Sequence, residues 1–195
     1  EVPISLLTRT LAALFERVYA KSIPFPFDGF TTERGNAATD CAMFTRELFL
    51  GRVDREWITA RQSRERNRVV EVLDSCWGAL DGAGAVRLLP AHPTVRAVIE
   101  GIDARLDADD GDASLCLGAV ARELCLPPYG CNIAATGLVL ALYVAPRRDT
   151  LEVRRHGEAT GIERWLQDAL PRRFLELSVL DTTEIVRVSE KTVGE

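Results

Sequence analysis

Lysine and histidine are scarce in this sequence. Lys21 and Lys191 are its lysines and His92 and His156 its histidines, so nearly all of the positive charge is arginine. The 24 basic residues against 29 acidic ones give a net charge of −5. This balance argues against general electrostatic capture of nucleic acid or of an anionic membrane surface.

Nucleotide-binding motifs are also missing. No lysine follows a glycine pair at the spacing of a P-loop, and Gly82-Ala83-Gly84 lacks the third glycine of a dinucleotide fingerprint. No signal peptide, membrane span or lipidation motif is visible. We therefore expect a cytoplasmic, non-enzymatic chain that takes no cofactor. Because the sequence begins at Glu1 rather than at Met, we also expect it to be a piece of a longer protein.

The five cysteines are odd in number and have no C-x-x-C spacing, which is typical of reduced thiols in a core: Cys41, Cys76, Cys116, Cys125 and Cys131. Cys125 and Cys131 could share a metal with His156, but two further ligands at proper spacing are lacking. The run Asp107, Asp109, Asp110 and Asp112 departs from the spacing of a calcium-binding EF-hand. Our interpretation is therefore core thiols, a polar linker and no metal site.

The longest apolar run lies between Leu115 and Ala145. Its second half, Asn132 to Ala145, contains no charged residue, so we expect a helix buried on nearly all sides. It is too short to cross a bilayer, which needs about twenty apolar residues. Before it, Pro127-Pro128-Tyr129-Gly130 predicts a rigid corner between two helices, and Asn132 is placed to cap the second.

Periodicity predicts a mainly helical protein with a helical domain over 1–110 and a winged-helix-like α+β domain over 111–195. The fold class is thus a helical bundle followed by a winged-helix-like unit. The expected helices are Ser5–Ala20, Asn36–Leu50, an arginine-rich helix ending near Leu80, a helix opened by Pro93, Ser114–Leu124, Asn132–Ala145 and Ile162–Leu170 with a cap at Thr160; the expected strands are Val86–Leu89, Leu151–Arg155, Phe174–Leu180 and Ile185–Val188. The Pro-Phe connector at 23–27 is expected to pack across a groove of its own domain.

Two groups of arginines are candidates for contact with nucleic acid or a partner. The first, Arg61, Arg64 and Arg68, opens the arginine-rich helix, where positive charge opposes the helix dipole. A solvated face paired with Glu65 and Glu71 is the alternative for this group. The second group flanks the expected hairpin and comprises Arg147, Arg148, Arg154 and Arg155. These would touch phosphate rather than bases, and the alternative is again a solvated, internally paired surface.

Helix, corner, helix and hairpin follow each other as in a winged-helix unit. The helix that would enter the major groove has no Arg, Lys or Gln to read a base edge. For this reason a stand-alone winged-helix DNA-binding regulator is kept as the alternative function and not as the leading one. A cysteine or metal enzyme is a third possibility.

The corner Leu126-Pro127-Pro128-Tyr129-Gly130, the apolar helix ending LALYVA, and Thr160-Gly161-Ile162-Glu163-Arg164-Trp165-Leu166 resemble a helical module of very large bacterial P-loop ATPases. These are the ATPases of phage-exclusion (BREX-type) defence systems. Cys131-Asn132-Ile133 departs from the charged residues usual after this glycine, and the nucleotide-binding motifs of the family are absent. The resemblance implies a non-catalytic arm of such an ATPase. Our leading hypothesis is therefore a scaffolding or interaction module that contacts other subunits of a defence complex, with the DNA backbone as a further candidate contact and no membrane partner.

Overall fold

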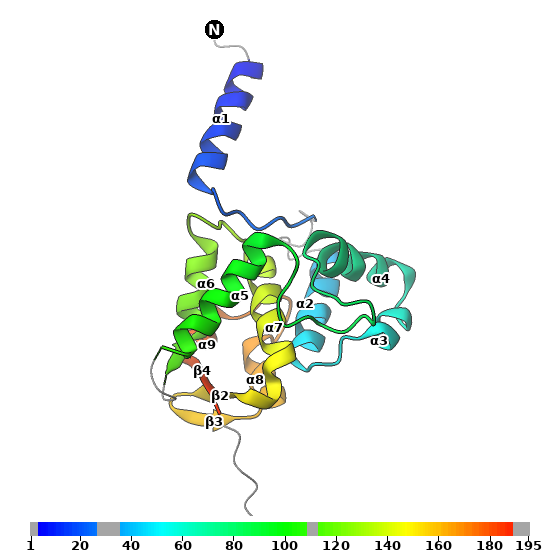
Figure 1. The fold of residues 1–195 in the computed structure, drawn as a ribbon, viewed down its shortest axis with the longest axis vertical. Coiled ribbons are helices and arrows are strands. Elements are labelled where there is room, and N and C mark those ends of the chain that lie inside the picture. The colour runs from blue at the N-terminus through cyan, green and yellow to red at the C-terminus, as the bar shows by residue number, and fades with distance from the viewer. Residues whose placement is uncertain (1–3, 27–35, 109–112, 189–195) are drawn as a thin grey trace, which may run out of the picture.

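A computed structural model describes residues 4–26, 36–108 and 113–188. Figure 1 shows helices gathered around α7, a small sheet at one end of the body and α1 projecting from the other end. In chain order the elements are α1 (Ile4–Val18), α2 (Asn36–Phe49), α3 (Arg55–Thr59), α4 (Ser63–Val69), the π-helix η2 (Val70–Cys76), α5 (Pro93–Leu106), β1 (Ser114–Cys116), α6 (Leu117–Cys125), α7 (Ile133–Val144), the 3-10 helix η3 (Ala145–Thr150), β2 (Leu151–Arg155), β3 (Glu158–Thr160), α8 (Ile162–Ala169), α9 (Leu177–Leu180) and β4 (Thr183–Arg187). The prediction of an α-rich fold with a small α+β part is confirmed.

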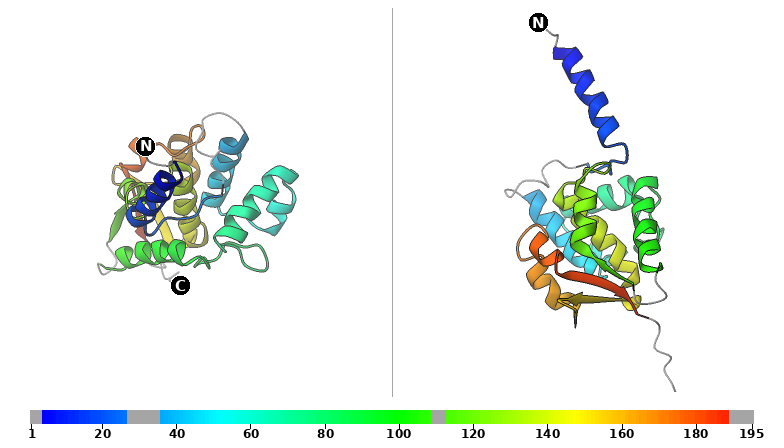
Figure 2. Two further views of the ribbon diagram at one scale, coloured as in Figure 1. Left: turned by 90° about the horizontal axis from the view of Figure 1, so that it is seen from above. Right: turned by 90° about the vertical axis from the view of Figure 1, so that its left-hand side faces the viewer.

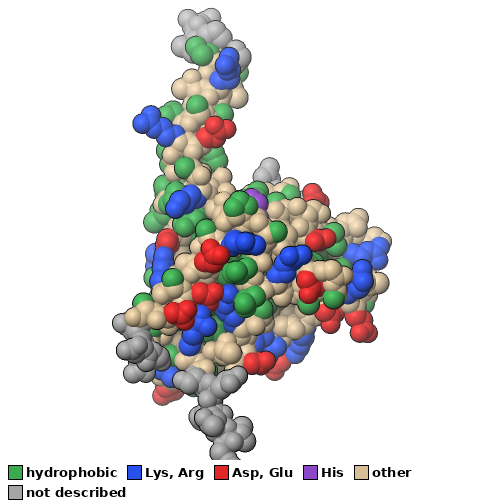
Figure 3. All heavy atoms as spheres, viewed as in Figure 1, with side chains coloured by type: hydrophobic (Ala, Val, Ile, Leu, Met, Phe, Trp, Pro, Cys, Tyr) green, Lys and Arg blue, Asp and Glu red, His purple; other side chains and the backbone are tan. Residues whose placement is uncertain are grey.

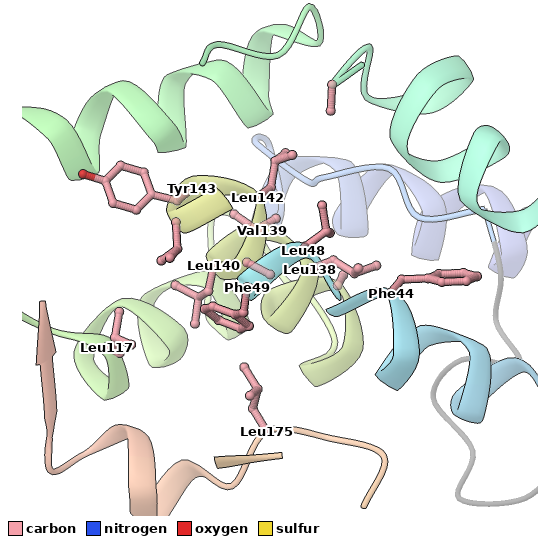
Figure 4. Packing of buried hydrophobic residues seen from close by; sticks show 14 of the residues in the cluster. Phe44, Leu48, Phe49, Leu117, Leu138, Val139, Leu140, Leu142, Tyr143 and Leu175 are labelled. Atoms are coloured by element: carbon pink, nitrogen blue, oxygen red, sulfur yellow. The ribbon is translucent and has the colours of Figure 1, made fainter. Parts of the chain in front are cut away.

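Helix α7 is the centre of the core. Every residue from Ala134 to Val144 is buried, as the uncharged run predicts. Figure 4 shows Leu138, Val139, Leu140 and Leu142 surrounded by side chains from other elements, among them Phe44 and Phe49 of α2. A helix without a polar face is stable only when neighbours cover it on all sides, and here α2, α6 and η3 are among the elements that pack against α7.

The predicted corner joins α6 to α7. The peptide bond between Pro127 and Pro128 is cis, and Gly130 has a positive φ of 64°. The Asn132 side chain accepts a hydrogen bond of 2.8 Å from the backbone N–H of Ala135, so its predicted role as the cap of α7 is confirmed.

The strands form one antiparallel sheet in the order β1-β4-β2-β3. Val153 of β2 lies opposite Ile185 of β4, and both are buried, so this face of the sheet covers the helical core. His156 lies in the hairpin turn between β2 and β3, where it is exposed and has a positive φ of 53°. Because β4 comes from the end of the chain and lies between β1 and β2, the sheet is completed only by the last described strand.

Both predicted domains contribute to one hydrophobic cluster. It contains Phe44, Trp77 and Ile99 from before residue 110, and Leu138 and Trp165 from after it. The rings of Phe49 and Trp165 meet edge to face with their centroids 5.1 Å apart. The division at residue 110 stays a prediction, and the two parts share a core. The predicted linker residues Asp109, Asp110 and Asp112 lie outside the described residues.

Four local predictions are wrong. Val86–Leu89 is not a strand, because Val86 forms only an isolated bridge with Leu80. Ser114–Cys116 is strand rather than helix, because Leu115 pairs with Ile185 and this tertiary contact overrides local propensity. Residues 174–180 contain the short helix α9 rather than a strand. Thr160 belongs to β3, where it lies opposite Val153, so Gly161 takes the N-cap position of α8 without a side-chain hydrogen bond.

Candidate interaction surfaces

Helix α1 carries an uncovered apolar stripe. Ile4, Leu7, Leu11, Leu14 and Val18 alternate at spacings of three and four residues, and we call this set the α1 seam. Each of the five side chains is at least 47% exposed. Figure 3 shows hydrophobic side chains along α1 where it stands clear of the body. A spacing of three and four residues is the one that lets two helices interlock side chains.

The connector after α1 fixes the helix to the body. Trp77 donates an indole N–H hydrogen bond of 2.7 Å to the carbonyl of Pro24, and Ile23 is buried beside it. The predicted packing of this connector across its own domain is thereby confirmed over its described residues. At the corner, a Cβ on Gly130 would lie 2.4 Å from Cδ1 of Tyr19, so this residue has to be glycine for Tyr19 to approach. Hence the corner seats the end of α1.

The first predicted arginine group is engaged inside the molecule. Asp40 of α2 is buried and accepts two hydrogen bonds of 3.2 Å from Arg64, while Arg68 donates to the same carboxylate. Arg61 lies over the ring of Trp57, with its guanidinium carbon 4.8 Å from the ring centroid. The positive charge at the start of α4 therefore ties α4 to α2 through the buried Asp40, whereas the stated alternative had Glu65 and Glu71 as the partners. Contact of this group with nucleic acid or a partner stays a prediction.

The second predicted group is also engaged. Arg154 pairs with Glu152 at 2.6 Å, Arg155 pairs with Asp168, and Arg148 donates to the carbonyl of Leu50. Arg154 and Arg155 keep part of their side chains in solvent, at 43% and 32% exposure. Contact of this group with nucleic acid stays a prediction, and each contact with a phosphate would compete with these internal bonds.

Arg147 is the exception among the predicted contact residues because it is only 5% exposed. Its Nε and Nη2 atoms donate to the two carboxylate oxygens of Asp103 at 3.0 and 2.6 Å, and its Nη1 donates to the carbonyls of Leu88 and Tyr143. The Tyr143 hydroxyl also donates to Asp103, at 2.9 Å, and burial together with this carboxylate raises the pKa of Tyr143. Arg187 of β4 donates to Asp103 as well. We call these four residues the Asp103 network, and Arg147 is not available as a surface contact.

A third group of arginines lies outside the candidates that the sequence pattern indicated. Arg46 on α2 and Arg172 and Arg173 after α8 line an open hollow of about 720 Å³, together with Met43, Phe174 and Glu176. We call it the arginine hollow. Figure 2 shows α2 beside the segment that follows α8, which brings the two sets of residues together. The signals in the sequence were the adjacent arginines after Pro171 and the helical spacing of Met43 and Arg46, but their meeting depends on the tertiary fold.

The cysteines are free thiols. Burial raises the pKa of both Cys41 and Cys131 to about 12, so these two stay protonated at neutral pH. Figure 1 shows the turn between β2 and β3 at the opposite end of the body from the corner between α6 and α7. His156 comes from that turn, and it is not grouped with Cys125 and Cys131 at a metal site. Within the described ranges, no group of three or more His, Cys, Asp and Glu side chains is arranged to hold a metal ion.

None of the helices that the structure describes combines the length and the apolar character needed to span a membrane. Comparisons of the chain with family models, with curated proteins and with solved structures found no match.

Proposed function

We propose that this chain is a non-catalytic interaction module that docks onto a partner protein through the α1 seam. The observation that carries the proposal is the distribution of exposed apolar side chains. Among the described residues, α1 holds seven of the eleven exposed large hydrophobics: Ile4, Leu6, Leu7, Leu11, Leu14, Phe15 and Val18. An apolar stripe concentrated on one projecting helix marks a contact surface, whereas scattered single residues do not.

The occupant that fits the seam is an amphipathic helix of another protein with acidic side chains beside its apolar stripe. A lone helix of 15 residues is marginal in water, so α1 gains stability when a second helix covers the seam. The described charges of α1 and the turn after it are Arg9, Glu16, Arg17 and Lys21, a positive excess. Two parallel copies of α1 would bring these excess charges together, whereas an acidic partner helix would neutralise them.

The resemblance of the corner and of α7 to defence ATPases supplies the partner class. In our proposal the chain is a scaffolding arm of a large anti-phage ATPase, and the acidic helix belongs to another domain or subunit of that complex. The native reading frame and its neighbouring genes test this part. A P-loop ATPase encoded in the same reading frame or in the same operon supports it. The absence of such an ATPase from both the reading frame and the neighbouring genes contradicts it.

DNA binding as a winged-helix regulator is the alternative. In such a unit the second helix of the corner enters the major groove. Here that helix is α7, whose residues are buried in the core, so it would have to leave the core to reach a base edge. The phosphate contacts would then fall to arginines such as Arg154 and Arg155, which are paired with Glu152 and Asp168. These observations favour the protein-docking function.

The docking function is tested with a synthetic amphipathic peptide that carries leucines at spacings of three and four and glutamates beside them. Calorimetric titration against the full chain is expected to give saturable binding, while a peptide of the same composition in shuffled order does not bind. Leu11→Asp places a charge in the seam and is expected to weaken binding at least about tenfold. Ala12→Asp adds the same charge about 100° around the helix from Leu11 and outside the seam, and is expected to leave the affinity unchanged.

Three outcomes contradict the proposal. Equal loss of binding in the two variants would mean that the seam is not the contact. A dimeric mass in solution that Leu11→Asp converts to monomer would make a second copy the occupant. Binding to duplex DNA that falls steeply with salt, and that substitution of Arg154 and Arg155 abolishes, would favour the winged-helix alternative.

A further inference from the structure

We propose that the arginine hollow binds a small organic anion in which a flat apolar ring system carries a phosphate or carboxylate group. The hollow lies between α2 and the segment that joins α8 to α9, and its lining contains no residue of α1. The inference therefore does not rest on the docking function and adds a ligand site to it.

Arg46 is held in place for this role. Its Nη2 atom donates a hydrogen bond of 2.8 Å to the carbonyl of Leu170, the residue that ends α8. This bond restrains the guanidinium, and it is the one hydrogen bond that the Arg46 side chain makes to another described residue. A guanidinium that is oriented before binding loses little conformational entropy when it meets a carboxylate or a phosphate.

Arg172 and Arg173 bring two more positive charges to the same hollow. Among the described residues neither forms an ion pair, in contrast to Arg64, Arg154 and Arg155. Three guanidinium groups around one hollow repel each other, and an anion bound between them removes this repulsion. Charge-assisted hydrogen bonds from arginine are also short and directional, and often bidentate with phosphate or carboxylate.

Part of the lining of the hollow is apolar, and we call this part its floor. Met43 and Ala42 come from α2 and Phe174 from the segment after α8, and Phe174 also packs against the core cluster. Methionine and phenylalanine side chains together suit the face of a flat ring. A hydrated inorganic anion would leave this floor uncovered, so the ligand needs an apolar part as well as a charge.

The volume of the hollow and its one acidic lining residue, Glu176, limit the ligand further. A volume of about 720 Å³ lies in the range typical of small-molecule sites, roughly 300–1,000 Å³. Glu176 also lines the hollow and opposes a second negative group on its side, while it can accept a hydrogen bond from an amino or hydroxyl group. A ring with one anionic group and one hydrogen-bond donor, as in a nucleoside monophosphate, matches these features.

The test uses adenosine 5′-monophosphate and 2-naphthoate as probes, with adenosine and inorganic phosphate as the separated halves of the first. Met43 is the single methionine of the sequence, so a labelled methionine methyl group gives one NMR signal that reports on the hollow. We expect both probes to shift this signal in a saturable way. Adenosine and phosphate are expected to bind at least about tenfold more weakly than the monophosphate, because each retains only one of the two contacts.

Two double variants test whether the arginines of the hollow, and not the net charge of the chain, bind the probes. Arg172→Gln with Arg173→Gln is expected to weaken both probes at least about tenfold, because two charge-assisted contacts are removed. Arg9→Gln with Arg17→Gln makes the same change in net charge on α1 and leaves the affinity unchanged. The far-ultraviolet circular dichroism and melting temperature of all variants are compared first, so that a loss of binding is separated from a loss of fold.

The inference is overturned if neither probe shifts the Met43 signal at about millimolar concentration, the weak end of specific affinity. It is also overturned if the Arg172 and Arg173 variant binds the probes as the unchanged chain does, or if adenosine binds as well as its monophosphate. Leu11→Asp, which tests the docking function, is expected to leave probe binding intact. Failure of one proposal is thus distinguishable from failure of the other.

Discussion

Asp103 shows how a single side chain links distant parts of this chain. Its carboxylate meets Tyr143 of α7, Arg147 of η3 and Arg187 of β4, so one residue of α5 connects the helical part with the sheet. Arg147 is buried, and its charge is compensated almost entirely by this carboxylate and two carbonyl groups. A buried arginine that loses its carboxylate keeps its desolvation cost without compensation.

We therefore predict that Asp103→Ala lowers the free energy of unfolding by about 3–5 kcal/mol, measured by urea denaturation. Asp107→Ala is the matched control, because Asp107 also pairs with Arg187 but is 59% exposed. Its substitution is expected to cost below about 1 kcal/mol, since solvent screens exposed pairs. Equal losses in the two variants would show that the network does not stabilise the fold as described.

Two buried thiols predict a pH dependence. Burial raises the pKa of Cys41 and of Cys131 from 9.0 to about 12 in the folded chain, while in the unfolded chain both ionise near 9. Their contribution to stability is thus fully present below pH 9 and is lost as the pH rises from 9 toward 12. From pH 8 to pH 10 we expect a loss of about 1 kcal/mol for each thiol. In Cys41→Ala one of the two thiols is removed, so urea unfolding is expected to show about half of the summed loss of the two. A pH profile that stays the same in this variant would contradict the raised pKa of Cys41.

At the scale of elements, two helical glycines differ in what surrounds them. Gly118 of α6 faces the backbone of Asp181, and a Cβ at this position would lie 2.8 Å from the Asp181 nitrogen and Cα. Gly101 of α5 has no atom within 4 Å of such a Cβ. The first glycine allows α6 to approach the segment after α9, whereas the second has no packing role.

This contrast predicts opposite effects of one substitution. Gly118→Ala is expected to destabilise the protein by about 1–3 kcal/mol, because a backbone has to move to admit the methyl group. Gly101→Ala is expected to stabilise it by about 0.5–1 kcal/mol, the difference in helix propensity between glycine and alanine. Thermal and urea unfolding of the pair measure both signs. A gain in stability on substituting Gly118 would contradict the close approach of α6.

At the scale of the whole molecule, apolar residues divide into two populations. Those of α7 fill the core, and those of α1 stand in solvent (Figures 3 and 4). Leu138→Ala is expected to cost about 2–5 kcal/mol of stability, because it opens a cavity in the core. Leu11→Ala is expected to change the stability of the free chain by at most about 0.5 kcal/mol. A large loss for Leu11 would mean that α1 packs on the body and that its seam is already covered.

The sequence by itself determined the local elements whose causes are local. The absence of charge from Asn132 to Ala145 places α7 in the core, and the proline pair with Gly130 predicts the corner. Periodicity also predicted a helix over Ser5–Ala20, but periodicity alone does not tell whether the domain covers the apolar side of this helix.

Only the tertiary structure decided what each arginine meets. The contact partners of the arginines are far apart in the sequence: 24 residues for Asp40 and Arg64, 44 for Asp103 and Arg147, and 124 for Arg46 and Leu170. Neither periodicity nor spacing predicts pairs at such separations. The same holds for Ser114–Cys116, which is a strand because β4 lies beside it. The physical reason is that hydrophobic periodicity arises along one element, whereas ion pairs and strand pairs depend on which elements the closed core brings together.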